Sequence, residues 1–490
     1  MSDPTSDELP SSELLGQRFP TRSVDTPSDS PGSSVAPSAP LSAASRRAGN
    51  RRQDREIARL AVPAFAALIS EPLFLLADAA IVGHLGTAQL AALGIAGTVV
   101  QTSVGLFVFL AYGTTSSVAR SLGAGDERAA LSRGIDGLWL ALGIGAAVCL
   151  ALLALAPTIV DTFGPDPRVR TFALLYLRIA AFGVLALLVM FAATGVLRGL
   201  QDTKTPLVVA VVANLVNIAL NVLFVFGFGW GIAGSAAGTL VAQGVAAFVM
   251  TYVVVRAARN SGASLAPHRD GVIDAWRVGV PLIVRTLTLR AALLLTTYVA
   301  ARISTPAIAA HQVAFTIWAF LAFALDAIAI AGQAITGRLL GASDAAGARA
   351  ATRRMIWWGI VCGIALGLLI AATRPLIVPL FSPDAEVQQL LAGVLLILAL
   401  HQPIAGIVFV LDGVLIGAGD GRYLAWVGLI NLVAFVPLAL AVVWAGGGLA
   451  ALWWAFSGFM LVRMVTLLWR VRSDRWLVVG AVATTSRKHS

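Results

Sequence analysis

Residues 195–202 read GVLRGLQD, and residues 413–420, which lie 218 residues further along the chain, read GVLIGAGD. The same spacing relates LGAGD at 122–126 to LGASD at 340–344, and FGPD at 163–166 to FSPD at 381–384. Pro63 and Pro281, and Thr87 and Thr305, obey it as well. One register that holds over so long a stretch indicates a duplicated architecture rather than chance similarity. The sequence therefore predicts two homologous halves.

The composition shows which solvent surrounds these halves. Hydrophobic residues make up 58% of the chain and charged residues only 12%, with a mean hydropathy of +0.85. A soluble domain carries roughly 25% charged residues, which it needs for solvation. Lipid must therefore solvate most of this chain, and hydrophobic runs of about 20 residues are expected to span a bilayer.

Twelve such runs are predicted as transmembrane helices, six in each half. The resulting fold class is an all-α polytopic membrane protein, whose two six-helix lobes are related by a parallel repeat about an axis along the membrane normal. The predicted spans are 60–83, 90–117, 134–160, 171–197, 205–228 and 232–256 in the first half, and 275–301, 308–336, 354–380, 390–416, 423–445 and 447–469 in the second.

The basic residues predict the orientation, because Lys and Arg accumulate in cytoplasmic loops. The loops on one side hold most of them, whereas the opposite loops hold only Arg168, Arg170, Arg302 and Arg374. We expect a multi-pass plasma-membrane protein with both termini in the cytoplasm. The expected parts are a disordered cytoplasmic tail at 1–55, an N-terminal lobe at 56–257, a cytoplasmic linker at 258–274, a C-terminal lobe at 275–470 and a cytoplasmic tail at 471–490.

Several function classes are disfavoured by the sequence. The formal net charge of +10 arises from basic loops between apolar runs, so topology explains it better than nucleic-acid binding. Cys149 and Cys362 lie inside apolar runs without ligand spacing, and we expect neither a metal site nor a cofactor. No zinc-binding His-Glu-x-x-His, nucleophile elbow or nucleotide loop occurs, which argues against an enzyme and against direct ATP drive.

A family resemblance is carried by the run GVLRGLQDTKTP at 195–206. It resembles the cytoplasmic signature of the multidrug and toxic compound extrusion (MATE) family, and most of all its DinF-like branch. AD at 77–78 with VGHLG at 82–86, AAHQ at 309–312, and Asp326 with AGQ at 331–333 are similar to further signatures of that branch. The resemblance covers roughly residues 55 to 470. It implies export of small organic, often cationic, compounds by proton or sodium antiport.

The first half contains the main candidate for ion coupling. Charged groups inside a span are costly and mark functional sites. Glu71 and Asp78 lie about two turns apart and share a face of the first helix. Asp78 matches the family's helix 1 aspartate, which the resemblance associates with coupling-ion or substrate binding, whereas Glu71 has no clear counterpart. The structural alternative for Asp78 is a hydrogen-bonded carboxylate without a transport role.

An amide stripe is predicted beside this carboxylate. Asn214, Asn217 and Asn221 are spaced by three and four residues, so they share one face of the fifth span. They could bond Asp78, coordinate a cation or join helices by hydrogen bonds. Family members often carry an aspartate at the position of Asn221, and its loss favours proton coupling, because sodium prefers several oxygen ligands. Three further residues could extend this network, namely Gln101, Arg178 and Gln243, and Arg178 could neutralise Glu71 or Asp78.

The second half contains charges of both signs inside its spans. Arg285, Arg290, Asp326 and Asp412 could form a neutral paired network, with Gln333 beside it. Thr296 stands at the repeat position of Asp78, so we assign ion coupling to the first half and cavity shaping to the second.

The expected function is a secondary active antiporter that exports organic compounds, with cations as the expected class, in exchange for protons by alternating access. The expected partners are an organic substrate and membrane lipid, with no nucleic acid, and the expected state is a monomer. The alternatives are a sodium-coupled exporter of the same family and a flippase for lipid-linked precursors. A flippase needs a cationic cavity, for which only Arg178, Arg285 and Arg290 are candidates.

Overall fold

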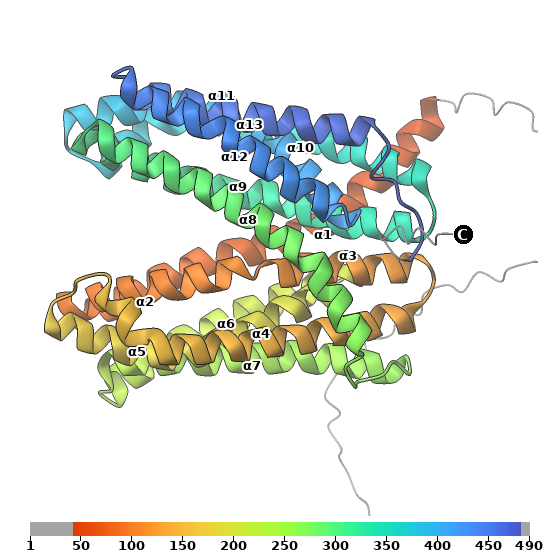
Figure 1. The fold of residues 1–490 in the computed structure, drawn as a ribbon, viewed down its shortest axis with the longest axis horizontal. Coiled ribbons are helices and arrows are strands. Elements are labelled where there is room, and N and C mark those ends of the chain that lie inside the picture. The colour runs from red at the N-terminus through yellow and green to blue at the C-terminus, as the bar shows by residue number, and fades with distance from the viewer. Residues whose placement is uncertain (1–42, 482–490) are drawn as a thin grey trace, which may run out of the picture. The chain divides into compact units, whose positions relative to one another are not determined.

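The computed structural model describes residues 43–481 of the chain, and Figure 1 shows its ribbon. The parts of the two predicted tails at 1–42 and 482–490 lie outside the described residues. Within the described part, twelve helical segments are long and apolar enough to cross a membrane, and no residue is in a strand. The predicted fold class, with twelve membrane-crossing segments, is therefore confirmed.

The helices divide into two sets that correspond to the predicted halves. The first set contains α1 (Ala43–Gly83), α2 (Thr87–Leu106), α3 (Phe109–Gly123), α4 (Glu127–Asp161), α5 (Pro167–Gly199), α6 (Lys204–Val222), the π-helical turn η1 (Leu223–Gly227) and α7 (Gly231–Asn260). The second set contains α8 (Arg269–Ile303), α9 (Thr305–Gly341), α10 (Ala345–Phe381), α11 (Ala385–Gly417), α12 (Gly421–Trp444) and α13 (Leu449–Arg472).

The repeat reappears in the helix boundaries. The starts of α2, α4, α5 and α7 each recur 218 residues later, as the starts of α9, α10, α11 and α13. The repeated LGAGD and LGASD motifs have a structural reason. Asp126 caps the N-terminus of α4 by accepting from the Ala129 N–H at 2.7 Å, and Asp344 accepts from the Gly347 N–H of α10 at the same distance. Such caps satisfy N–H groups that lack partners in the first helical turn.

One difference between the halves was not predicted. The second span is broken into α2 and α3 at residues 107–108, whereas its counterpart α9 is continuous. A Cβ atom at Gly105 would overlap with the Arg290 guanidinium of α8, so Arg290 occupies the space beside the break. The break therefore lies where a charged side chain of the second half packs against the first.

We call the first set of helices the N-lobe and the second the C-lobe, and Figure 1 shows them as two bundles that meet at one end. The lobes touch most closely where α3 and α9 end. A Cβ atom at Gly123 would overlap with the backbone carbonyl of Arg338, and one at Gly341 with the carbonyl of Arg120. These contacts are related by the same 218-residue shift, so the pseudo-twofold relation between the lobes passes through this point. We call this end of the lobes the junction end.

Gly123→Ala and Gly341→Ala are expected to weaken the contact between the lobes. Overpacking typically costs about 1–3 kcal/mol, which exceeds the roughly 1 kcal/mol that Ala gains over Gly in a helix. Both variants should lower the midpoint of thermal unfolding. Gly143→Ala is the matched control, because nothing lies within 4 Å of its added Cβ. Equal midpoints for all three variants would contradict the close approach.

The linker between the lobes is shorter than the predicted 258–274, because α7 continues to Asn260 and α8 begins at Arg269. The linker is held against α4. The buried Asp136 carboxylate accepts from the His268 N–H at 2.8 Å, and the Trp139 indole donates to the Leu265 carbonyl at 3.0 Å. The first part of α8 thus packs on the N-lobe before the helix crosses to α12, as Figure 1 shows.

The predicted N-terminal tail at 1–55 is too long, because α1 begins at Ala43 and residues 43–55 are helical. Charged side chains on this part of α1 bind the C-lobe. Asp54 accepts from Arg354 at 2.6 and 2.7 Å and from the Trp358 indole at 2.8 Å, and Glu56 pairs with Arg338. Tertiary ion pairs therefore extend a helix whose sequence is too polar to predict as a span.

The segment 473–481 also differs from the prediction of a plain tail. It lies along the junction end, and Trp476 within it is only 1% exposed. The buried Arg120 guanidinium of α3 donates to the Val478 carbonyl at 2.9 Å and to the Gly480 carbonyl at 3.1 Å. Arg349 of α10 pairs with Asp474. The segment therefore contacts both lobes.

Candidate functional site

The centre of the N-lobe holds Asp78 of α1, whose exposed fraction is 4%. Its Oδ1 atom accepts a hydrogen bond from the Asn221 amide of α6 at 2.9 Å and one from the Ser235 hydroxyl of α7 at 2.7 Å. The Tyr176 hydroxyl of α5 lies beside the same carboxylate. Four helices therefore converge on one carboxylate. Ser235 and Tyr176 were not predicted, because a single hydroxyl in an apolar helix gives no periodic signal.

Asp78 has no basic partner. Across residues 49–481, whose side chains the structure describes, no Lys, Arg or His nitrogen lies within 4.0 Å of its oxygens. The hydrogen bonds come from neutral groups, which orient the carboxylate without cancelling its charge. The Asn221 Oδ1 atom, which is buried over Gly238, also lacks a hydrogen-bond donor. The site is thus rich in acceptors.

The predicted amide stripe lies between α1 and α7. Asn214 donates to the Ser70 carbonyl of α1 at 3.1 Å, and Asn217 accepts from the Thr239 hydroxyl of α7 at 3.3 Å. Asn217 and Asn221 are buried at 2% and 0% exposure, and Asn214 is half-buried. Only Asn221 touches Asp78, so the stripe joins helices along its length and contacts the carboxylate at one end.

Three other predicted residues of this network are not brought to Asp78. Glu71, Gln101 and Arg178 are exposed, and none makes a side-chain hydrogen bond or ion pair within the described residues. The suggestion that Arg178 neutralises Glu71 or Asp78 is therefore wrong for this structure. The physical reason is the rotation of α5, which buries Tyr176 toward Asp78 and leaves Arg178 on the exposed face.

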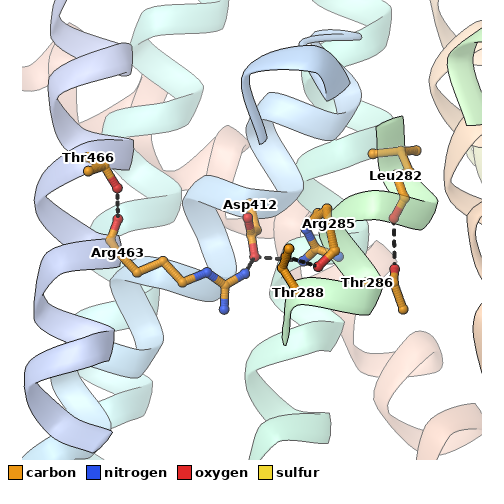
Figure 2. Close-up of polar contacts among 7 residues, drawn as sticks. All are labelled: Leu282, Arg285, Thr286, Thr288, Asp412, Arg463 and Thr466. Atoms are coloured by element: carbon orange, nitrogen blue, oxygen red, sulfur yellow. Dashed lines mark hydrogen bonds and ion pairs between the residues drawn. The ribbon is translucent and has the colours of Figure 1, made fainter. Parts of the chain in front are cut away.

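The C-lobe contains a second buried polar centre, which Figure 2 shows in close-up. Asp412 of α11 lies between two guanidinium groups. Arg285 of α8 donates to its Oδ2 atom at 2.6 Å, and Arg463 of α13 donates to the same atom. The side chains of Arg463 and Asp412 are 9% and 8% exposed. We call these three residues the C-lobe triad.

The triad corrects the predicted pairing of the second half. Arg285 and Asp412 do pair, but the second partner is Arg463, which lies in the last span and was not selected. Among the residues that the structure describes, Asp326 makes no ion pair within 4.0 Å, and neither does Arg290, which packs against Gly105. Gln333 is buried at 2% exposure without a partner for its Oε1 atom. A charge inside an apolar run was the signal that could have identified Arg463.

The two polar centres therefore carry opposite net charge. The N-lobe centre is a carboxylate to which no described basic side chain is paired, and the C-lobe triad has two guanidinium groups around one carboxylate. Two repeated lobes with ionisable groups buried at membrane depth are typical of secondary transporters. Fold and sites together thus define a multi-pass membrane protein of the transporter class.

Comparison with known proteins gives the family. The sequence model of the MatE family matches residues 63–223 and again residues 281–442, so the chain belongs to the MatE family of multidrug efflux transporters. Its two matches start 218 residues apart, as the repeat requires. The chain is 31% identical to Protein DETOXIFICATION 44, chloroplastic, of Arabidopsis thaliana, covering 86% of this chain and 83% of that protein.

Two further proteins resemble this chain, one in sequence and one in fold. DNA damage-inducible protein F of Escherichia coli is 28% identical and covers 85% of this chain and 92% of its own length. The crystal structure of the Vibrio cholerae MATE transporter VcmN in the bent form shares the fold, with a TM-score of 0.80 at 21% identity over 88% of this chain and 99% of that one. The family resemblance identified in the sequence is confirmed.

Proposed function

We propose that this chain is a secondary active antiporter that exports organic compounds, with organic cations as the expected substrates, in exchange for protons. The observation that supports the proposal is Asp78, a buried carboxylate with three neutral polar neighbours and, in the described part of the chain, no basic side chain within 4.0 Å. An isolated buried charge is costly, so neutralisation by a proton or by a cationic substrate is favourable. The proton and the cationic substrate cannot neutralise the carboxylate at the same time, so binding of one disfavours binding of the other. This linkage is the thermodynamic basis of exchange.

Sodium coupling is the second candidate, and one observation favours it. Asn221 Oδ1 is an unpartnered acceptor beside Asp78, and oxygen atoms of Asp78, Asn221 and Asn217 could serve a hard cation. Only one of these groups is charged, however. A proton requires only the carboxylate itself, so we retain proton coupling as the proposal.

Alternating access follows from the two-lobe architecture. We propose that the junction end faces the cytoplasm, because it carries Arg120, Arg133, Arg338 and Arg349, and basic residues remain on that side of the plasma membrane. In this structure the lobes meet at that end, so export requires the contacts at Gly123 and Gly341 to separate. We also propose that a monomer surrounded by lipid suffices, because each polar centre is complete within one lobe.

The decisive experiment is efflux from proteoliposomes that contain the purified protein, with a fluorescent organic cation as substrate. A proton gradient should drive efflux, and a sodium gradient at constant pH should not. Efflux driven by the sodium gradient would show that sodium, rather than the proton, is the coupling ion at this site. Movement of a fluorescent lipid with a phosphate headgroup, without efflux of the cation, would favour the flippase class instead.

A further inference from the structure

A small cavity lies inside the C-lobe, between α8, α11, α12 and α13. Its polar lining consists of the C-lobe triad together with Thr288 and Asn431, and its apolar lining includes Leu289, Val427 and Phe459. Its volume is about 20 Å³, on the measure by which one water molecule needs roughly 10–15 Å³. The cavity therefore has room for one small species, such as a water molecule or a monatomic ion.

The charge around this cavity is positive. Arg285 and Arg463 contribute two positive charges, and Asp412 contributes one negative charge. Asp326 acts electrostatically on Arg285, and Arg198 acts in turn on Asp326. Including these two further charges, which are of opposite sign, leaves the balance unchanged at one positive charge in excess. Burying an uncompensated charge is costly, so a compensating anion stabilises the cluster.

The cavity also has hydrogen-bond donors without partners. Asn431, which is 1% exposed, has no partner for its side-chain nitrogen or its side-chain oxygen. The Nε atom of Arg285 is buried without a partner as well. Thr288, in contrast, is already satisfied, because its hydroxyl donates to the Arg285 carbonyl at 2.8 Å. Buried polar groups in native proteins usually have partners, so these atoms are available to bind a small polar species in the cavity.

We propose that the cavity binds a small monovalent anion of the size and charge of chloride. A water molecule would satisfy the donors but would leave the excess charge, and two guanidinium groups would repel a cation. An organic anion exceeds the available volume. The donors that remain on Arg285 and the Asn431 amide supply the charge-assisted and neutral hydrogen bonds that a halide accepts.

The repeat shows that this site is particular to the C-lobe. The N-lobe positions that lie 218 residues before the three charged residues Arg285, Asp412 and Arg463 are Ala67, Thr194 and Val245, none of them charged. The charged cluster is therefore not needed to build the lobe fold itself, because the N-lobe has the same fold without these charges. It is independent of the exchange proposed at Asp78, and either proposal can fail without the other.

The first test is thermal unfolding of the purified full-length protein in detergent, with chloride titrated against gluconate at constant ionic strength. Chloride and bromide should raise the midpoint saturably, by about 2 °C, because a ligand that binds only the folded state stabilises it. Gluconate is too large for the cavity and should have no such effect. Absence of any halide-dependent shift overturns the proposal and leaves an ordered water only.

Two variants locate the response. Asn431→Leu retains every charge but removes the amide, so it should abolish the shift, whereas Asn214→Leu makes the same change in the N-lobe and should retain it. Arg463→Met removes the excess charge and should raise the half-saturating chloride concentration about tenfold or more. A full chloride response in Asn431→Leu would place the anion elsewhere and overturn the proposal.

A measurement on the unaltered protein covers the case in which the variants do not fold. Crystals grown in bromide should show an anomalous scattering peak between Arg285, Arg463 and Asn431. A peak at this position supports the site. Bromide peaks confined to the surface, or solvent density here without anomalous signal, overturn it.

Discussion

Asp78→Asn is expected to leave the protein folded and to abolish gradient-driven export. Asn has nearly the same shape as Asp and can still accept hydrogen bonds from Asn221 and Ser235, so the packing of α1, α6 and α7 should persist. It cannot ionise, and the variant should therefore remain in the state that corresponds to a neutralised site. Efflux from proteoliposomes should fall to the level of empty vesicles, and the remaining rate should not depend on pH.

Glu71→Gln is the matched control, because it makes the same chemical change on the same helix at an exposed position. We expect it to retain most of the export rate. Substrate binding by Asp78→Asn, measured by equilibrium dialysis, should show whether the carboxylate is needed for the substrate as well as for the proton. If Asp78→Asn keeps its full proton-driven efflux and Glu71→Gln loses it, Glu71 rather than Asp78 is the coupling carboxylate.

Much of the architecture could be predicted because its signals are periodic. The 218-residue repeat related the two lobes, and four pairs of helix starts obey it, among them those of α5 and α11. The spacing of Asn214, Asn217 and Asn221 placed the three amides on one face, and the structure places that face against α1 and α7. A helix fixes the relative directions of its own side chains, so such patterns can be read from the sequence.

Other features could not be predicted, because they depend on how helices rotate against each other. Arg178 was expected near Asp78, but the rotation of α5 presents Tyr176 there instead. The sequence places both Asp326 and Asp412 inside predicted spans, and only packing selects Asp412 as the partner of two arginines. The positions of α1 before residue 56 and of segment 473–481 likewise depend on ion pairs and carbonyl contacts between distant residues.

Asp412→Ala is expected to have the largest effect on stability. Its removal leaves Arg285 and Arg463 buried together without a counter-charge, and breaking a buried pair in this way typically costs about 3–5 kcal/mol. Two like charges at this position also repel each other. We expect a low yield of folded protein after detergent extraction, measured by size-exclusion chromatography, and loss of the cooperative thermal transition in the protein that remains.

The matched comparison is Arg463→Met, which removes a charge from the same triad but leaves Arg285 and Asp412 as a neutral pair. Its unfolding midpoint should lie well above that of Asp412→Ala, because the number of uncompensated buried charges falls from two to none. Asp326→Ala, which loses no ion pair, should also be milder than Asp412→Ala. If Arg463→Met destabilises the protein as much as Asp412→Ala does, shape rather than charge holds the triad together, and the excess positive charge has no structural consequence.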